Sequence, residues 1–401
     1  SHQSEIQTRW VREMPDPIEH IRSKLAVFWH NHFVTEYEVY DCPSYMWAYY
    51  NLLHTSVLGN FRTLVEEMGK NPAMLNYLDG DQNIVDEPNE NYARELMELF
   101  TMGENNGYTQ TDIVEVSRAL TGWTQIAYNC ELPYFEPDYF DNGQKTIFGQ
   151  TGNWGYDDVH ELIFTLRQNQ VAEYICSKIY RHFVYEEPDM DIVAAMSQTF
   201  IDNNWELAPV FRQLFKSEHF FEDRFINSKI KSPLEVFHSL LRRTGLEFGI
   251  GYDQGTIESI VYDSMDLGQY IFNPVDVAGW PGQRTWVNEN TLTRRWAFVQ
   301  NYLFNTMGNN DDTRDKLRQL AIDLTDTAEK DPVVVTQALA AHFLNTNLND
   351  QNLETAVQYF KGEVPENYFM DGTWGLYFEE VPDQIINLLF YLTRLPEWQL
   401  T

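Results

Sequence analysis

The chain has 401 residues, of which 60 are acidic and 28 are basic, so its formal net charge is −32 at pH 7. A surface this negative repels phosphate backbones, which argues against nucleic-acid binding. Hydrophobic residues make up 43% of the sequence, which fits a globular protein and not a disordered one. No apolar run approaches the roughly 18 residues of a membrane span. Aromatic residues, at 15%, either enlarge the core or line a groove for sugars or other ring-bearing ligands.

The three cysteines, Cys42, Cys130 and Cys176, form no CxxC pair, which argues against a thiolate zinc site. They allow at most one disulfide, and three buried free thiols are an equally good interpretation. The sequence holds no phosphate loop, dinucleotide fingerprint or nucleophile elbow. We therefore expect no nucleotide cofactor.

Apolar residues recur mainly at helical spacing. The first such run is Leu25, Phe28, Trp29, His32 and Phe33, at positions i, i+3, i+4, i+7 and i+8. The same spacing predicts helices over 72–78, 90–101, 109–120, 158–166, 171–184, 192–203, 206–216, 234–243, 291–304, 313–323, 333–344, 353–360 and 383–392. Thr109 and Asp112 form a capping box at the start of one of these helices.

Two stretches, 124–155 and 267–290, break the helical pattern. In the first, the tight-turn signal at 141–143 predicts a short β-hairpin, or an ordered loop, between 134–140 and 145–148. The second stretch contains Gly279-Trp280-Pro281-Gly282, which cannot form a regular helix. We predict an all-α fold, a single large helical domain with a short β-hairpin or ordered insertion near 124–155.

Several short strings follow one another along the chain. They are Phe28-Trp29-His30-Asn31-His32-Phe33, His54 before Leu58-Gly59-Asn60-Phe61, Leu78-Asp79-Gly80, Pro88-Asn89-Glu90-Asn91-Tyr92-Ala93-Arg94-Glu95-Leu96-Met97-Glu98-Leu99-Phe100, Tyr108-Thr109, Arg118-Ala119-Leu120-Thr121-Gly122-Trp123, Lys231-Ser232-Pro233, Phe272-Asn273-Pro274 and Gly279-Trp280-Pro281-Gly282. In this order they resemble the bacterial family known as domain of unknown function 1800, over nearly the whole chain. The resemblance implies one helical domain over 1–401, without the further helical segment that family members carry ahead of this first string. It also implies a periplasmic, cell-surface or secreted location, and it implies no reaction.

Three histidines form a candidate metal site. His30 and His32 are close in sequence, and His54 is the best third nitrogen for a zinc-like ion. Positions i and i+2 lie about 200° apart on a regular helix, so a shared metal needs the helix to end or distort there. The alternative is that His32 is a hydrogen-bonded core residue and that His30 caps a neighbouring helix.

The predicted helix over 90–101 carries a second candidate site. Glu90, Arg94 and Glu98 follow i, i+4 and i+8, which predicts a ladder of opposite charges. Glu95 lies nearer the apolar border, where a partly buried carboxylate has a raised pKa and can act as a general acid or base. Asn91 completes this group. The alternative is a structural salt-bridge network that anchors the helix to a loop.

The segment 79–90 has the donor spacing of a calcium loop between two helices. Loop positions 1, 3, 5, 7, 9 and 12 are Asp79, Asp81, Asn83, Val85, Glu87 and Glu90. Position 6, where such loops need a positive φ, is Ile84 and not glycine. We expect calcium here in preference to a transition metal at the histidines, and a plain connector between helices is the alternative.

Two functions fit these observations. The first is an extracytoplasmic or cell-surface binding or scaffolding protein for polysaccharide or a partner protein, which the aromatic content and the lack of a sharp catalytic signature favour. The second is a metal-dependent hydrolase, which the strings around the charged helix favour. Its side chains, which should then converge on one accessible cavity, are those of His30, His32, His54, Asn91, Arg94 and Glu95.

Overall fold

The computed structural model of the chain describes residues 2–16, 18–245, 254–304 and 311–401. Helices make up 64% of the protein, and the sheets among these residues are two antiparallel pairs of short strands. The all-α prediction with a small β insertion is therefore confirmed. The residues group into two compact units: unit 1 comprises Ser1–Ile6, Ile21–Phe225 and Ile271–Trp280, and unit 2 comprises Gln7–His20, Ile226–Tyr270 and Pro281–Thr401. The single domain over 1–401 stays a prediction.

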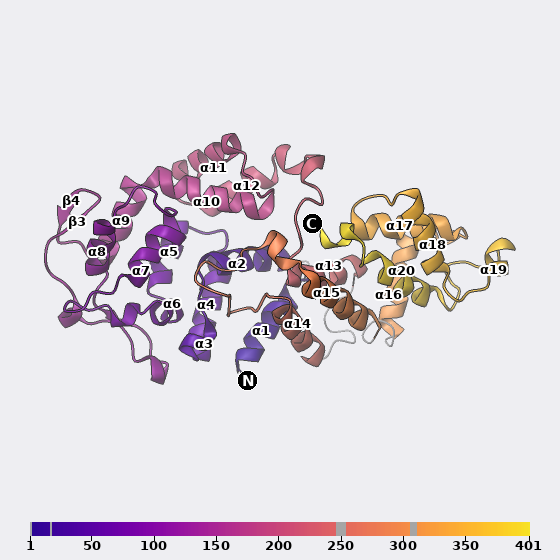
Figure 1. Cartoon of the computed structure of the whole chain (residues 1–401), viewed down its shortest axis with the longest axis horizontal. Coiled ribbons are helices and arrows are strands. Elements are labelled where there is room, and N and C mark those ends of the chain that lie inside the picture. The colour runs from indigo at the N-terminus through magenta and orange to yellow at the C-terminus, as the bar shows by residue number, and fades with distance from the viewer. Residues whose placement is uncertain (1, 17, 246–253, 305–310) are drawn as a thin grey trace. The chain divides into compact units, whose positions relative to one another are not determined.

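Unit 1 is built mainly from helices α2 to α12. They are α2 (His20–His32), α3 (Tyr37–Tyr40), α4 (Pro43–Ser56), α5 (Phe61–Gly69), α6 (Pro72–Tyr77), α7 (Glu90–Glu95), α8 (Gln110–Ala119), α9 (Tyr156–Leu166), α10 (Gln168–Phe183), α11 (Met190–Asp202) and α12 (Leu207–Phe215). Helices α4, α5 and α6 pack together, and α10 packs against α11 (Figure 1). Helix α1 (His2–Glu13) begins in unit 1 and continues in unit 2.

Helix α2 forms because its apolar residues recur at helical spacing and can be buried together on one face. Leu25, Phe28 and Trp29 are all at most 4% exposed, so the predicted apolar face is buried. The Trp29 indole also donates a hydrogen bond to the carbonyl of Val57, 3.1 Å away. The helix begins five residues before the predicted run, at His20.

The strands pair differently from the predicted hairpin. Strand β1 (Trp123–Thr124) pairs with β2 (Tyr134–Phe135), and β3 (Lys145–Ile147) pairs with β4 (Gln150–Gly152). The turn at 141–143 therefore joins two small sheets, and a hairpin of 134–140 with 145–148 is wrong.

The side chains around this turn explain the difference in pairing. The Asp141 carboxylate accepts hydrogen bonds from Arg118, at 2.8 Å, and from the Gly143 N–H, at 2.7 Å. The buried Lys145 ammonium donates to the carbonyls of Asp141 and Gly143, so the turn folds around this cation. The two flanks pair instead with other strands, β2 with β1 and β3 with β4.

The predicted helix over 90–101 changes type halfway. It is α-helical to Glu95 and π-helical from Leu96 to Thr101. The Met102 N–H donates to the carbonyl of Met97, and the Thr101 hydroxyl donates to that of Leu96 at 2.5 Å. A π-turn aligns residues four and five apart, so Leu96, Phe100 and Thr101 all reach the core.

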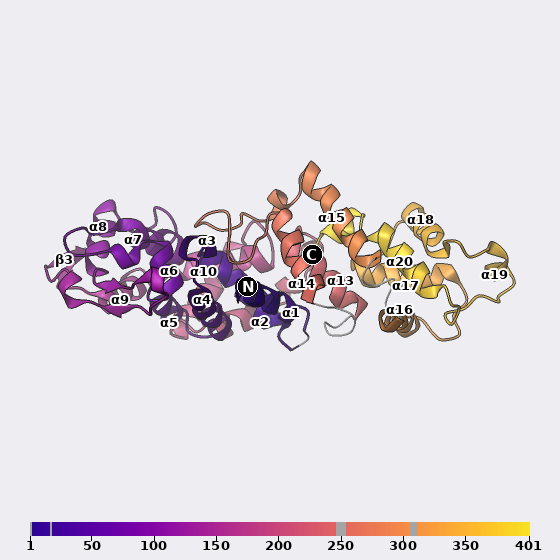
Figure 2. The same ribbon diagram turned by 90° about the horizontal axis from the view of Figure 1, so that it is seen from below.

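Unit 2 contains the remaining helices. They are α13 (Pro233–Thr244), α14 (Gln254–Asp266), α15 (Glu289–Tyr302), α16 (Asp311–Leu324), α17 (Pro332–Leu344), α18 (Asp350–Lys361), α19 (Glu366–Met370) and α20 (Val381–Leu392). Helices α17, α18 and α20 pack against one another in both views (Figure 1, Figure 2). Within the described parts of the chain, no helix is long and apolar enough to cross a membrane.

Candidate functional site

His30 anchors a distant segment of unit 1. Its Nε2 accepts a hydrogen bond from the backbone N–H of Phe272, 2.9 Å away, so the ring proton is on Nδ1. Nδ1 donates to the hydroxyl of Tyr49 at 2.7 Å, and that hydroxyl donates to the carbonyl of Phe33 at 2.6 Å. Burial lowers the pKa of His30 to about 3, so the ring is neutral. Both ring nitrogens are thus in use, and neither is left for a metal.

Asn31 holds the end of the same segment. Its Oδ1 accepts from the Trp280 N–H at 2.6 Å, and its Nδ2 donates to the Trp280 carbonyl at 3.2 Å. Gly279 has a φ of +84°, and a Cβ there would collide with the Asn31 side chain. Three of the strings that carry the resemblance, at 28–33, 272–274 and 279–282, therefore meet in one structural cluster.

The other two histidines have separate surroundings. His32 donates from Nε2 to the carbonyl of Phe100 at 3.0 Å, and its Nδ1 is buried without a hydrogen-bond partner among the described residues. His54 lies on α4 and stacks on Tyr50, with ring centroids 4.1 Å apart. The structure does not bring the three imidazoles to one point, and the described residues contain no group of three His, Cys, Asp or Glu that could hold a metal ion.

The charge ladder on α7 is present, and its members are partly exposed. The Arg94 guanidinium lies 2.9 Å from Glu90 and 3.5 Å from Glu98, which confirms the predicted pairing. It also donates to the amide of Gln110 at 3.2 Å. The Arg94 side chain is 36% exposed, so the ladder belongs to the surface and not to the core.

Glu95 follows the ladder at the point where the π-helix begins. Its carboxylate is half-buried and makes no hydrogen bond to any described residue. Burial, together with the charge of Glu98, raises its pKa to about 6, and Arg94 opposes the rise. Asn91, one turn earlier, donates to the Asp79 carboxylate at 2.9 Å, so it serves the loop before the helix.

The loop 79–90 uses several of its predicted calcium ligands internally. Asn83 is buried, donates to the Ser117 carbonyl at 2.9 Å and accepts from the Asn89 N–H at 2.8 Å. Glu90 accepts from both Arg94 and Gln110. The positive φ falls at Asp79, the first loop position, and not at the sixth. The loop therefore takes another path than a calcium loop, and calcium binding stays a prediction.

The remaining predicted ligands of this loop also have separate surroundings. Asp81 accepts from Asn76 at 3.2 Å, and burial raises the pKa of its carboxyl. The Val85 N–H donates to the Tyr139 carbonyl at 2.8 Å. Glu87 lies at the exposed surface of the loop. Among the described residues, the Asp and Glu side chains of this loop do not form a group of three that could hold a metal ion.

Five large apolar side chains are exposed in the stretch that breaks the helical pattern, within strand β2 and on either side of it. They are 41% to 75% exposed, and we refer to these residues together as the apolar face: Ile126, Leu132, Tyr134, Phe135 and Tyr139. Contiguous exposed apolar patches on proteins mark interaction sites, which makes this segment a candidate binding surface. The run Leu132-Pro133-Tyr134-Phe135 is the sequence signal that could have indicated it.

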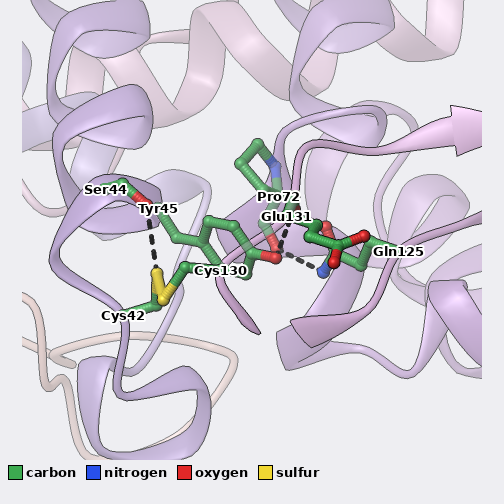
Figure 3. The surroundings of a disulfide bond; sticks show 7 residues. All are labelled: Cys42, Ser44, Tyr45, Pro72, Gln125, Cys130 and Glu131. Atoms are coloured by element: carbon green, nitrogen blue, oxygen red, sulfur yellow. Dashed lines mark hydrogen bonds between the residues drawn. A yellow bond between two sulfur atoms is a disulfide. The ribbon is translucent and has the colours of Figure 1, made fainter. Parts of the chain in front are cut away.

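Three contacts attach residues 125–131, within and beside this face, to the beginnings of helices α4 and α6 (Figure 3). A disulfide joins Cys42 to Cys130 across 88 residues of sequence. The Tyr45 hydroxyl donates to the Glu131 carbonyl at 2.5 Å, and the Gln125 amide donates to the carbonyl of Pro72 at 3.0 Å. Of the two interpretations of the cysteines, the single disulfide is the one observed, and Cys176 is a buried free thiol.

The family model described as protein of unknown function (DUF1800) matches residues 1–400. The chain belongs to this family. No curated protein and no solved structure matches it. The match confirms the resemblance that the ordered strings carry, and it adds no reaction or ligand.

Two of the DUF1800 strings make contacts that hold helices and segments in place. The string 28–33 anchors the segment 271–280, and Lys231-Ser232-Pro233 begins helix α13, where the Ser232 hydroxyl accepts from the Glu235 N–H at 3.3 Å. The apolar face lies outside these strings. Any ligand of the apolar face would therefore contact residues that do not belong to the strings shared with the family.

Proposed function

We propose that this DUF1800 protein is an extracytoplasmic polysaccharide-binding protein and that the apolar face of unit 1 is its binding surface. The observation that carries the proposal is the exposure of three aromatic rings, Tyr134, Phe135 and Tyr139, on one segment tied to the helices by a disulfide. Exposed aromatic rings offer flat apolar surfaces on which the C–H faces of sugar rings can stack.

The polar residues of the same segment suit a carbohydrate as well. Glu131, Glu136 and Asp138 alternate with the aromatic residues and are exposed or half-exposed. Their carboxylates can accept hydrogen bonds from sugar hydroxyls, which fixes the orientation of a stacked ring. The net charge of −32 disfavours anionic polymers, so we expect a neutral polysaccharide.

The disulfide supports both the binding role and the location. A surface held in its bound conformation loses less entropy when a ligand binds, and Cys42–Cys130 restrains this segment. Disulfides persist in oxidising compartments, which supports a periplasmic, cell-surface or secreted location.

Binding to insoluble cellulose, chitin and β-1,3-glucan tests the proposal, with soluble alginate as the anionic comparison. We expect retention on at least one neutral polymer, and a Leu132→Ser/Tyr134→Ala variant should bind it at least about tenfold more weakly, a loss of about 1.4 kcal/mol. Tyr377→Ala, which removes a 71% exposed tyrosine in unit 2, is the matched control and should bind normally. Equal binding by all three proteins, or none, would refute the proposal.

A hydrolase is the second candidate, and Glu95 is the observation that favours it. A carboxyl with a pKa of about 6 is protonated often enough near neutral pH to act as a general acid. Glu98, which Arg94 pairs at 3.5 Å, is a carboxylate beside it, and two carboxyls in unlike surroundings can divide acid and base roles.

A release assay for reducing sugar on the polymer that binds tests this candidate. If Glu95 is the acid, Glu95→Gln should lower the rate at least about a hundredfold without changing retention. Glu104→Gln, which changes an exposed neighbouring carboxylate, is the control. Sugar release that is unchanged in Glu95→Gln would eliminate this role.

A further inference from the structure

Lys145, the first residue of strand β3, has a buried side chain although that side chain ends in an amine. The residue is 1% exposed, and its Nζ lies 4.7 Å from the centre of the Phe140 ring. The amine donates to the backbone carbonyls of Asp141 and, at 3.0 Å, of Gly143. Burial lowers the pKa of this amine, and the charge of the Asp141 carboxylate opposes the change. A buried lysine that loses its proton more readily is a better nucleophile.

The register of the β3–β4 hairpin brings a side-chain amide to this amine. Lys145 pairs with Gly152 across the two strands, so Asn153, the next residue, lies at the open end of the hairpin. The Lys145 Nζ is 3.5 Å from the amide oxygen of Asn153. The amide carbon Cγ is bonded to that oxygen, so a small rotation of the side chain gives the separation of about 3–3.5 Å at which reacting atoms are poised.

The Asn153 amide has a second orientation, which suits the release of its nitrogen. Turned about its Cβ–Cγ bond, the amide donates from Nδ2 to the carbonyls of Asn142 and Gly143, at 3.0 and 3.2 Å. The Gly143 carbonyl then accepts from both side chains, so the amide nitrogen lies beside the lysine nitrogen. Asn153 is exposed, so a group that leaves Cγ can pass directly into water.

We propose that Lys145 and Asn153 are joined by an intramolecular isopeptide bond. The Lys145 ammonium first gives up a proton, and the Nζ lone pair then attacks Cγ of Asn153. The Nζ–Cγ bond forms, the Cγ–Nδ2 bond breaks, and Nδ2 leaves as ammonia, which takes up the released protons. An ammonium group and a carboxamide thus become a secondary amide and an ammonium ion, and the reaction needs no oxidant, reductant or cofactor.

The surroundings of Lys145 suit both the reaction and its product. The charges of Glu115 and Asp158 act on the amine, and a carboxylate this near can carry the proton from Nζ to the leaving nitrogen. The product no longer has a charge in a buried position, where a charge is costly. Its single amide N–H can still donate to the Asp141 carbonyl, while Gly143 is exposed, so its carbonyl can accept from water.

The bond would close the open end of a very short hairpin. Strands β3 and β4 have three residues each, and a two-stranded hairpin is only marginally stable in water. A link between residues 145 and 153 holds the two strands in register, and a reductant that opens the disulfide would leave it intact. The proposal does not depend on polysaccharide binding.

Mass spectrometry of the reduced full-length chain tests the proposal. We expect a mass below that of the sequence by about 17 Da, the mass of the one ammonia that the bond formation releases. Trypsin then locates the bond, because Lys145 is the one basic residue between Arg118 and Arg167. An amide-linked Lys145 resists trypsin, so we expect one peptide, 119–167, in place of 119–145 and 146–167. Chymotryptic cleavage at Phe148, inside the ring that the bond closes, should leave the two halves joined.

Three variants separate the bond from another loss of ammonia. Asn142 precedes Gly143, and such a pair can lose ammonia by closing a succinimide, so Asn142→Ala is the matched control and should keep the loss. Lys145→Arg and Asn153→Ala should each have the full mass of their sequence. The wild-type peptides decide the matter even where a variant does not fold. A wild-type chain of full mass that gives two separate tryptic peptides, or a loss that disappears only in Asn142→Ala, would overturn the proposal.

Discussion

The imidazole of His30 accepts a hydrogen bond from the backbone N–H of Phe272, although the two residues are 242 positions apart in sequence. Asn31 makes a two-point contact with Trp280 on the other end of the same segment. Together they fasten the segment 271–280 to helix α2. The Phe-Trp-His-Asn-His-Phe string therefore stabilises unit 1 through long-range hydrogen bonds.

Replacing His30 with alanine should destabilise unit 1. The change leaves the Phe272 N–H buried without an acceptor and opens a cavity beside Tyr49, and we expect a loss of about 2–4 kcal/mol in the free energy of unfolding. Urea denaturation measures the loss, and hydrogen exchange at the Phe272 amide should accelerate. His2→Ala, at an exposed position, is the control. A loss below about 0.5 kcal/mol would mean that His30 does not hold the segment.

The buried histidines should make the protein sensitive to acid. Burial lowers the pKa of His30 to about 3 and that of His160 to about 4, well below the unfolded value of 6.5. The unfolded chain therefore takes up protons below pH 6.5 that the folded chain does not, and stability falls with pH. At pH 5 each such histidine costs about 2 kcal/mol.

His160→Gln isolates one of these contributions. The loss of stability between pH 7.5 and pH 5 should be smaller by about 2 kcal/mol than in the wild-type protein. Denaturation curves at the two pH values measure this difference. Parallel pH profiles for the two proteins would show that folding does not lower the pKa of His160.

Local signals were enough to predict much of the helical fold. Helix α2 and the capping box at Thr109 follow from residues close in sequence, and the ladder around Arg94 follows from helical spacing alone. The half-burial of Glu95 was also predictable, because its position borders the apolar face of its helix.

The features that sequence reasoning missed depend on distant contacts. The strand pairing depends on how Arg118 and Lys145 hold the turn at 141–143, which no local pattern records. The π-helix buries Leu96, Phe100 and Thr101 together, and the local sequence does not show that these residues are all in the core. The pairing of Cys42 with Cys130 joins the start of α4 to a loop 88 residues further along the chain, and no local pattern records such a contact.

Glu95→Gln should stabilise the protein at pH 7.5 and have little effect at pH 4.5. The folded pKa of about 6 exceeds the ordinary glutamate pKa of 4.5, so folding disfavours the charged form and the carboxylate destabilises the folded protein above pH 6. After allowance for solvent screening we expect a gain of up to about 1 kcal/mol. Glu87→Gln, which changes an exposed carboxylate of the preceding loop, is the control and should not stabilise. A loss of stability in Glu95→Gln at pH 7.5 would contradict this assignment.

Removal of the disulfide should lower the free energy of unfolding of unit 1 by more than the removal of a surface ion pair does. Cys42→Ser/Cys130→Ser frees a loop of 88 residues, for which chain entropy gives about 4–5 kcal/mol. Arg94→Ala, by comparison, should cost below about 1 kcal/mol, because its ladder is partly exposed. Guanidinium denaturation of both variants measures the contrast. An equal cost for the two would mean that the loop 42–130 is already restrained in the unfolded chain.

Asn83 tests whether the loop 79–90 is a connector or a calcium site. Its side chain links the loop to Ser117 and Asn89, so Asn83→Ala should cost about 1–3 kcal/mol by leaving buried groups unpaired. If these bonds are its role, the cost should be the same with a chelator and with millimolar calcium, as measured by urea denaturation. Asp79→Ala, which removes the acceptor of Asn91, should behave in the same way. A cost that grows with calcium, together with heat on titration of chelator-treated wild-type protein, would instead establish the loop as a calcium site. In that case Glu90 would have to leave Arg94 and Gln110 to reach the ion, and Arg94→Ala should tighten binding.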